Sequence, residues 1–491
     1  MTKKPILFTI CGLLTFAVTH AQQTLSLQGV VVQAQQQSPS YYKARSSALN
    51  SLYAFRYYVA GRRPQLKLQA TNASSFLGNI ESIRQPDGTY AFSKSSYSYT
   101  FTSLAADQIV PFTGGQFSVA TNLSRNDVFD PSSSVGYLST PFSISYFQPT
   151  LLYNPYRWDS RIQPLLYEES KKQYIETLEK TGLQAAGYFF DALVAQQQEL
   201  ILQQNVANTD TLYKISKGRY ELGKIAENEL LQIELNLINA RNNLEQASLS
   251  KEIAYRELTQ FLTLPKGTTV QVSLPDTIPT LMIPLDIAQR EAQDNRQAVL
   301  TFRRQRLEAE QQVAEARGNS GYQLNLSANF GQARQGATLK NAYGGGNLQQ
   351  TQLLSVGVSI PIMDWGRARN RVRQAKANQE LMEIDIQQQE RNFEQEIYLQ
   401  TQQFNIQRKL LESAAKADTI AKQRYEITKQ RYYIGKISIT DLNLAQQEKD
   451  MANQNYINAL RSFWTSYYTV RLLTLYDFEK SQKIRYEFKE R

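Results

Sequence analysis

The heptapeptide RYELGKI, residues 219–225, recurs later in the chain as RYYIGKI, residues 431–437. The offset between the two copies is 212 residues, from position 219 to position 431. The same offset, without a gap, pairs Pro149 with Pro361 upstream and continues downstream of both heptapeptides. About 120 residues therefore repeat in register, which indicates a tandem duplication.

A second offset relates the beginnings of the two copies. QLKL at residues 65–68 matches QLNL at residues 323–326, which lies 258 residues later. The two offsets differ by 46 residues, which indicates an insertion in the first copy between Leu68 and Phe142. The predicted segments are a signal peptide at 1–21, a first repeat at 22–264, a linker at 265–284, a second repeat at 285–476 and a polar C-terminal tail at 477–491.

Each copy contains strand signals with a period of two residues. Hydrophobic residues alternate with small or polar ones within about 64–150 in the first copy and about 322–363 in the second. This alternation predicts four strands per chain, each with one apolar and one polar face. Such strands fit a barrel wall between water and lipid, and a soluble half-buried sheet is the alternative. Residues 72–141 are interpreted as an extra hairpin and a long loop, because Pro86-Asp87-Gly88 and Thr113-Gly114-Gly115 are turn signals.

The rest of the chain is rich in Gln, Glu, Ala, Leu and Lys, a composition that favours helices. The predicted helices are 25–60, 157–221 and 226–262 in the first copy and 285–317, 367–433 and 438–475 in the second. The longest two have about 65 residues, or roughly 100 Å at 1.5 Å per residue. The helices that follow them have hydrophobic residues at the three-four spacing of a coiled coil. These segments predict a shaft of long helices that ends in hairpins at Gly223 and Gly435.

The only histidine, His20, and the only cysteine, Cys11, lie in the predicted signal peptide. That segment has Lys3 and Lys4, then an apolar run, then Thr-His-Ala before Gln22. The mature chain is therefore expected to have no Cys or His metal site, no disulfide and no Cys- or His-dependent catalysis. We predict no catalytic residue, no metal site and no cofactor, and we do not expect an enzyme.

The formal net charge is +10 at pH 7. Because the signal peptide predicts export, we expect no nucleic-acid partner. The charge is interpreted as a solvated basic surface, or as attraction to anionic lipid headgroups or an acidic partner. After the signal, no stretch of about 18 uncharged apolar residues occurs, so no membrane-spanning helix is predicted. An exported chain of this kind is periplasmic, secreted or an outer-membrane β-barrel.

Four strands cannot close a barrel, since the smallest membrane barrels have about eight, so several chains are expected to pool their strands. The two heptapeptides, VSIPIMDWGR at 358–367 and QAKA at 374–377 resemble the TolC family of outer-membrane efflux proteins. The resemblance covers nearly the whole mature chain. It implies a mixed α and β membrane protein, in which a homotrimer forms a twelve-stranded outer-membrane barrel that continues into an α-helical tunnel through the periplasm. It also implies an equatorial layer made from the linker 265–284 and the C-terminal tail.

The resemblance further implies the exit duct of a tripartite efflux or type I secretion system. Its partners are expected to be a periplasmic adaptor (membrane fusion) protein, an inner-membrane transporter of RND or ABC type, and outer-membrane lipid. The alternatives are a periplasmic coiled-coil adaptor, a secreted structural coiled coil and a carboxylate-dependent hydrolase. The motifs do not specify the transported cargo.

The resemblance also assigns a periplasmic gate. Asp441 matches an aspartate that lines the narrow entrance, and Glu229 replaces the family's aspartate in the first hairpin, with Tyr432 expected to reach across to it. Leu444 and Ile437 stand where the family has a second aspartate and can have an arginine. The alternative for Asp441 is a carboxylate in the first turn of a helix, favoured by the helix dipole. For Glu229 and Tyr432 the alternative is an exposed helix face.

Two further groups of residues are predicted to have a role. The adaptor-docking hairpin tips are Gly223, Lys224, Gly435 and Lys436. The strand-to-helix passage is marked by Pro149, Pro361, Asp364 and Gly366. The first copy departs from the family's pattern here, because it has LYNP at 152–155 where the second copy has DWGR at 364–367.

Overall fold

The computed structural model describes residues 23–130, 132–265, 268, 270–275, 281–345, 347–434 and 436–486. The predicted signal peptide, Gly435, the end of the C-terminal tail and parts of the linker 265–284 lie outside the described residues. The chain divides into two compact units, which we call the hairpin unit and the sheet unit. The hairpin unit comprises Met1–Arg45, Tyr174–Asn295 and Gln395–Lys489, and the sheet unit comprises Ser46–Gln173, Arg296–Glu394 and Glu490–Arg491. Each unit takes segments from both sequence repeats, so neither repeat is a compact unit by itself.

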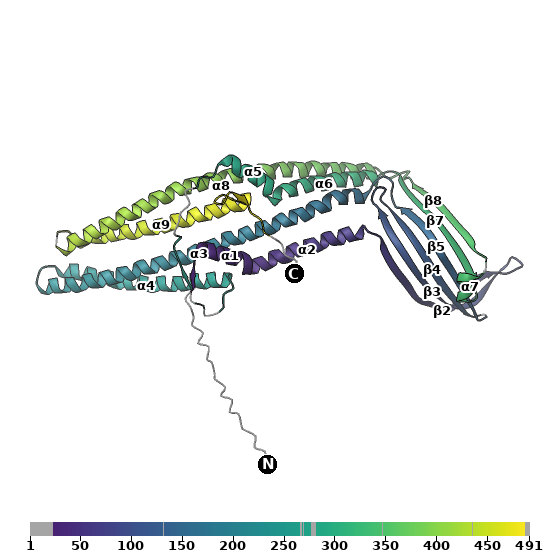
Figure 1. Ribbon diagram of the computed structural model, residues 1–491, viewed down its shortest axis with the longest axis horizontal. Coiled ribbons are helices and arrows are strands. Elements are labelled where there is room, and N and C mark those ends of the chain that lie inside the picture. The colour runs from purple at the N-terminus through teal and green to yellow at the C-terminus, as the bar shows by residue number, and fades with distance from the viewer. Residues whose placement is uncertain are drawn as a thin grey trace, which may run out of the picture. The chain divides into compact units, whose positions relative to one another are not determined.

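The sheet unit contains one antiparallel sheet of six strands in the order β2-β3-β4-β5-β7-β8 (Figure 1). Its strands are β2 Gln65–Arg84, β3 Tyr90–Val110, β4 Gly115–Asp130, β5 Ser134–Gln148, β7 Gln323–Gly336 and β8 Gln349–Ser359. The predicted number of four strands is therefore wrong. The extra hairpin predicted within residues 72–141 is present, but the predicted long loop is not, because those residues form β3, β4 and the ends of their neighbours. A short helix, α7 Leu339–Gly344, lies between β7 and β8.

Tight turns bring the inserted strands into the sheet. Between β2 and β3, the Gln85 N–H donates to the Thr89 carbonyl at 2.7 Å, and Asp87 Oδ1 accepts from the Thr89 N–H at 3.0 Å. Gly88 has φ +89° in this turn, and Gly114 has φ +87° between β3 and β4. Glycine adopts positive φ without a Cβ clash, so both predicted turn signals form turns.

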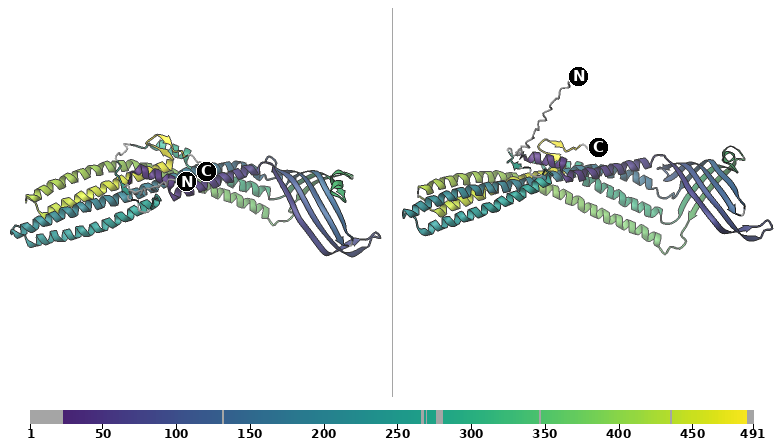
Figure 2. Two further views of the ribbon diagram at one scale, coloured as in Figure 1. Left: turned by 60° about the horizontal axis from the view of Figure 1, so that its bottom comes forward. Right: turned by 90° about the horizontal axis from the view of Figure 1, so that it is seen from below.

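Long helices make up the remainder of the sheet unit and most of the hairpin unit (Figure 2). They are α1 Leu27–Gln37, α2 Pro39–Gly61, α3 Pro155–Glu221, α4 Glu227–Phe261, α5 Leu285–Asn295, α6 Gln297–Gly318, α8 Arg367–Tyr433 and α9 Ile439–Thr474. Two short strand pairs complete the hairpin unit: β1 Gln23–Leu25 with β6 Val270–Val272, and β9 Tyr476–Asp477 with β10 Gln482–Lys483. None of the helices within the described ranges is both long and apolar enough to span a membrane.

Two segments predicted as single helices are broken. The segment 25–60 is interrupted at Ser38, which has ψ 157° and precedes Pro39, a residue that has no N–H to continue the helix. The segment 285–317 is interrupted at Arg296, which has φ −71° and ψ 142° and separates α5 from α6. The prediction of one continuous helix in each place is therefore wrong.

The core of the hairpin unit is aromatic. Phe189 and Phe190 of α3 are fully buried, and Phe404 of α8 packs against Phe463 and Tyr467 of α9 with ring centroids 5.3 and 6.1 Å away. These large side chains bury extensive apolar area between the helices, which stabilises the unit more than intrinsic helix propensity does.

Candidate functional site

One face of the sheet is apolar where the strands begin and end next to the helices. Leu68 lies opposite Leu104, and Leu326 lies opposite Val356. Leu68 and Val356 are 72% and 61% exposed. The edge strands β2 and β8 therefore present apolar side chains that no other described residue covers. Farther along β4 the same face carries Arg125 and Asp127, which form an ion pair, so the apolar side chains form a band and not the whole face. An apolar band of this kind is what lipid requires of a barrel strand.

The opposite face of the same strands is polar. Lys67 Nζ lies 3.3 Å from Asp107 Oδ2, and the Ser118 hydroxyl donates to Asp107 Oδ1 at 2.7 Å. These residues belong to three neighbouring strands, β2, β3 and β4. Charged and hydroxyl groups on this face require water or polar neighbours, so the sheet separates an aqueous side from an apolar side.

The segment that connects β8 to α8 is held by hydrogen bonds to an aspartate. Asp364 Oδ1 accepts from the Gly366 N–H and Oδ2 accepts from the Ala368 N–H, both at 2.9 Å. Gly366 has φ +83°, which an L side chain tolerates poorly, and the exposed Trp365 beside it has φ +53°. Asp364 and Gly366 therefore form a compact cap that ends the strand region and starts the helix.

The first copy forms this passage with different residues. Asn154 Oδ1 accepts from the Arg157 N–H at 3.3 Å, and its amide donates to the carbonyls of Pro111 and Phe112 at 2.8 and 3.1 Å. Asn154 thus caps α3 and also ties down the turn between β3 and β4. The departure of the first copy from the family's pattern is therefore a different cap, not a missing one.

Prolines follow the last strand of each copy. Pro149 comes directly after Gln148, the last residue of β5, and Pro361 lies two residues after Ser359, the last residue of β8. Because proline has no N–H for the ladder, each stops strand pairing close to where the long helix begins.

Each of the two hairpin tips has its own backbone hydrogen bond, and the two bonds are at equivalent positions of the repeat. The Lys224 N–H donates to the Arg219 carbonyl at 2.9 Å, and the Lys436 N–H donates to the Arg431 carbonyl at 3.0 Å. This bond, six residues to one, closes the C-terminus of a helix. Gly223 has φ +66° at the first tip. A Cβ built on Gly223 meets nothing within 4 Å, so the backbone conformation, not lack of space, favours glycine there.

Asp441 occupies the third position of α9 and forms a capping box with Ser438. The Ser438 hydroxyl accepts from the Asp441 N–H at 3.2 Å, while Asp441 Oδ2 accepts from the Ser438 hydroxyl at 2.7 Å and from its N–H at 3.2 Å. These two hydrogen bonds, the hydroxyl first, hold the pKa of the Asp441 carboxyl below its ordinary value. The carboxylate is exposed and therefore ionised at neutral pH.

Glu229 occupies the same position of α4, 212 residues earlier. Its N-cap is Ala226, whose methyl group forms no side-chain cap. Glu229 therefore lies in the first turn of a helix, with Glu227, where the dipole favours a carboxylate, but it has no serine to form a capping box. The two predicted gate carboxylates are equivalent in position and different in their local bonding.

Tyr432 is buried, which contradicts its interpretation as an exposed helix residue. It belongs to a cluster that we call the tip core, which comprises Leu212, Ile233, Tyr425, Tyr432, Ile439, Leu442 and Ala445. Its hydroxyl lies 3.4 Å from Ser216 Oγ. The expected partner, Glu229, is not the hydrogen-bond partner of Tyr432 in the structure. Tyr432 instead joins the α3–α4 hairpin to the α8–α9 hairpin through apolar packing.

A groove of about 480 Å³ lies on the second hairpin beside Asp441. It is lined by Ile420, Gln423, Arg424, Ile427, Thr428, Arg431, Ile437, Asp441 and Leu444. Two guanidinium groups thus share the groove with the carboxylate, and Arg424 is paired with Glu448. Ile437 and Leu444, which replace charged residues of the family, supply part of its apolar lining.

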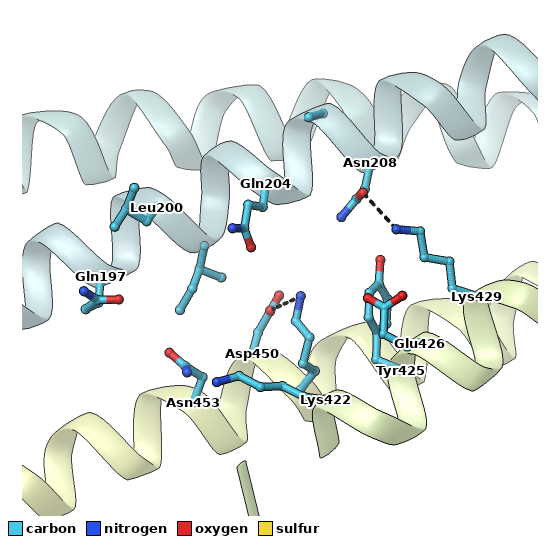
Figure 3. A pocket seen from close by; sticks show the side chains of 13 residues that line it. Gln197, Leu200, Gln204, Asn208, Lys422, Tyr425, Glu426, Lys429, Asp450 and Asn453 are labelled. Carbon is cyan, nitrogen blue, oxygen red and sulfur yellow. Dashed lines mark hydrogen bonds and ion pairs between the residues drawn. The ribbon is translucent and has the colours of Figure 1, made fainter. Parts of the chain in front are cut away.

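A larger hollow of about 650 Å³ lies between α3 and the α8–α9 hairpin (Figure 3). Figure 3 shows Asn208 of α3 and Lys429 of α8 pointing toward one another across it, with 3.5 Å between Oδ1 and Nζ. Lys449 Nζ lies 4.4 Å from the centroid of the Tyr425 ring, a cation–π contact, and burial raises the pKa of Tyr425 to about 12. The hydrogen bond across the hollow is at the limit of length, so this polar contact between the hairpins is weak.

A buried ion-pair network, which the sequence did not predict, holds the C-terminal segment. Arg471 of α9 pairs with Glu179 of α3 at 2.7 Å and with Asp477 of β9 at 3.0 Å. The Tyr486 hydroxyl donates to Glu179 at 2.5 Å, and the Gln35 amide of α1 donates to it at 3.2 Å. Burial raises the pKa of Tyr486, so that hydroxyl keeps its proton and remains a donor. No motif in the sequence predicts this network. The charges are paired with one another because burial separates them from water.

Residues 288–474 match the model of a family described as outer membrane efflux protein. No curated protein sequence matches the chain. The chain is similar in structure to the Campylobacter jejuni CmeC outer membrane channel, with 18% identity, a TM-score of 0.65 and coverage of 94% of this chain and 87% of that one. The outer-membrane channel OprN gives 15% identity, a TM-score of 0.65 and coverage of 91% and 89%.

The open state of the Neisseria gonorrhoeae MtrE outer membrane channel gives 14% identity, a TM-score of 0.60 and coverage of 94% and 91%. The predicted fold class, a sheet joined to long helices, and the resemblance to TolC-family channels are thereby confirmed. Residues 288–474 thus match the outer membrane efflux protein family, and the chain has the fold of TolC-family outer-membrane channels over more than nine tenths of its length.

Proposed function

We propose that this protein is the outer-membrane exit duct of a tripartite efflux or type I secretion system and that it has no catalytic role. The observation that carries the proposal is the sheet with one apolar and one charged face, in a chain that also contains two long helical hairpins. A wall between lipid and water and a helical conduit are the two parts that such a duct needs.

The working unit of this duct is a homotrimer. Two apolar seams of the hairpin unit support an assembly of several copies, because all their residues are more than half exposed in the single chain. On α4 the seam comprises Leu231, Leu235, Ile238 and Leu249, and on α8 it comprises Leu399, Ile406, Ile420 and Ile427. Three-four and seven-residue spacings of this kind form coiled-coil contacts, so the seam of one copy is expected to pack against the next copy.

The partners of the trimer are a periplasmic adaptor protein, an inner-membrane transporter of RND or ABC type, and outer-membrane lipid. The adaptor docks at the hairpin tips, Gly223, Lys224, Gly435 and Lys436. The closed backbone turns at Lys224 and Lys436 support this, because rigid tips present their side chains in fixed directions at little entropic cost. Outer-membrane lipid contacts the apolar face of the sheet.

The periplasmic gate consists of Asp441 and Glu229. One carboxylate of each kind from each of three copies forms an anionic ring that attracts cations. The low pKa of Asp441 supports this role, since its charge persists in mildly acidic surroundings. Tyr432 acts in the tip core, where it sets how closely the two hairpins pack, and not as a hydrogen-bond latch to Glu229.

A periplasmic coiled-coil adaptor or a structural coiled coil is the second candidate. A single hairpin suffices for an adaptor, whereas this chain has two hairpins that share one core and a six-stranded sheet with an exposed apolar face. Neither alternative gives that sheet a function.

The test is the state of the protein extracted from outer membranes in mild detergent. We expect a trimer by light scattering that shows mixed helix and sheet by circular dichroism. We also expect that cells lacking the protein become sensitive to, or fail to export, the cargo of their pump. A stable, folded monomer in mild detergent, or recovery of the protein in the soluble periplasmic fraction, contradicts the proposal.

A further inference from the structure

The six-stranded sheet has two open edges. Within the described residues, β2 pairs only with β3, and β8 pairs only with β7. The edge strands β2 and β8 have 20 and 11 residues. Long apolar edge strands with unpaired N–H and C=O groups are strong templates for another strand, and lipid cannot satisfy those groups. Another strand must therefore cover each edge.

A second copy of this chain fits both edges at once. All five strand pairs of the sheet are antiparallel, so β2 and β8, the first and sixth strands, run in opposite directions. Placing β8 of one copy beside β2 of the next copy continues the antiparallel pattern without interruption. The same contact repeats around a ring until the barrel closes.

The internal duplication predicts the register of that contact. β8 is the counterpart of β5 at the offset of 212, and the start of β2 is the counterpart of the start of β7 at the offset of 258. The pairing of β5 with β7 is therefore a template inside the chain. In it, Tyr146 lies opposite Ala328 and Phe147 lies opposite Ser327.

Transferred through the two offsets, this template places Val358 opposite Ala70 of the next copy and Ser359 opposite Gln69. The faces agree in this register. Val358 and Ala70 belong to the apolar face, since Val358 lies opposite Leu324 across its own ladder and Ala70 follows Leu68 at the two-residue period of β2. Ser359 and Gln69 belong to the polar face. A shift by one residue would place polar side chains in lipid.

We propose that three copies close a barrel of 18 strands, three times six, through β8–β2 contacts in which Ser359 of one copy lies opposite Gln69 of the next. This proposal rests on the trimer of the proposed function and replaces the twelve strands that the resemblance implies. Barrel diameter grows roughly linearly with strand number, so the pore is about half as wide again as one of twelve strands. Barrels of 16–18 strands enclose an aqueous channel, so this barrel suits bulky or hydrated cargo.

Paired cysteines test the register. Ser359→Cys with Gln69→Cys should form a disulfide between copies under mild oxidation, because opposed Cβ atoms in antiparallel strands lie about 4.5–5.5 Å apart. Within one chain these positions are five strand spacings, or roughly 24 Å, apart and cannot bridge. The chain's own cysteine, Cys11, lies in the predicted signal peptide.

The matched control is Ser359→Cys with Gln65→Cys, which places the same kind of side chain on the same face four residues away, roughly 13 Å along the strand. We expect covalent trimers on denaturing gels from the first pair and monomers from the control. Cross-linking by the control alone overturns the register. No cross-link by either pair in a protein that is trimeric overturns the β8–β2 contact and leaves the proposed function standing, whereas a monomeric protein contradicts the proposed function itself.

Electron cryo-microscopy of the same trimer counts the strands directly. We expect six strands from each copy in a section through the barrel. A barrel of twelve strands, with β3 and β4 outside the wall, overturns the proposal whatever the cross-links show.

Discussion

At the scale of single residues, Asp441 and Glu229 show how one position serves two purposes. Both lie in the first turn of a helix, where the macrodipole favours a carboxylate. Asp441 also exchanges hydrogen bonds with Ser438, which ties its charge to the start of α9. The two interpretations offered by the sequence, a gate carboxylate and a helix-terminus carboxylate, are therefore compatible. The spacing Ser-x-x-Asp at 438–441 was a readable sign of the capping box.

Two substitutions separate the charge of Asp441 from its capping role. Asp441→Asn removes up to three charges from a trimer, whereas Ser438→Ala removes the cap, at about 1 kcal/mol, and keeps the charge. In planar bilayers we expect Asp441→Asn to reduce cation selectivity and to raise the concentration of a trivalent cation needed for block by about tenfold or more. Ser438→Ala should leave both unchanged at pH 7.

The pH dependence gives a second readout of the same pair of variants. The Asp441 pKa is lowered in the folded protein, so the capping stabilisation is present above the ordinary carboxyl pKa and is lost as pH falls through the lowered value. Selectivity in the parent protein should therefore persist to a lower pH than in Ser438→Ala. If Ser438→Ala alters selectivity at pH 7 as much as Asp441→Asn does, the carboxylate acts through the helix terminus and not as a ring of charge.

At the scale of helices and strands, the sequence predicted the elements that occur in both copies and missed strands that occur in the first copy alone. The long helices and the first and last strands of each copy occur in both copies, so the pattern in one copy supports the assignment in the other. The strands β3 and β4 have no counterpart in the second copy, and their many polar residues, with tyrosines in β3, weaken the two-residue alternation. The helix break at Ser38 could have been predicted from Pro39, whereas Arg296 has neither proline nor glycine beside it. The burial of Tyr432 depends on the other hairpin, which local periodicity does not report.

The hairpin tips provide a prediction at this scale. Replacing Gly223 with Val forces a β-branched side chain into φ +66°, at a cost of about 1–3 kcal/mol of local strain, and should open the tip. The same exchange at Gly435 is expected to act on the second tip. We expect the double variant to insert into the outer membrane in normal amounts and to lose cross-linking to the adaptor. Gly218→Val is the control, because Gly218 lies within α3 and a Cβ there meets nothing within 4 Å. Equal adaptor cross-linking in the double variant and the control would place docking elsewhere.

At the scale of the whole molecule, the duplication and the compact units divide the chain differently. Each unit combines segments of both copies, so neither half of the sequence is expected to fold alone. The interior of each unit is shared by the two copies, as the tip core shows by joining α3 and α4 to α8 and α9. Besides the apolar face of the sheet, the part of the chain that the structure describes leaves two apolar helix seams and two sheet edges uncovered. Those four surfaces are where we expect further copies to bind.

Two neighbouring positions on α4 distinguish assembly from folding. Ile233 is 1% exposed and belongs to the tip core, whereas Leu235 is 57% exposed and belongs to the outer seam. Leu235→Glu adds a charge that a single chain leaves in water but that a contact between copies would bury. We expect it to shift trimers toward folded monomers or dimers in detergent, with little change in the helical circular dichroism of each chain.

Ile233→Ala should have the opposite effect, because it should lower the stability of each protomer and leave the trimer contact intact. Truncating a buried isoleucine costs about 2–5 kcal/mol of protomer stability through lost burial and the cavity left behind, so thermal unfolding should begin at a lower temperature while trimers persist below it. Light scattering and thermal denaturation of both variants give the comparison. If Leu235→Glu trimers are as resistant to dilution as the parent protein, the α4 seam faces water in the assembly. The contact between copies must then be made by the sheet edges and by other helix faces.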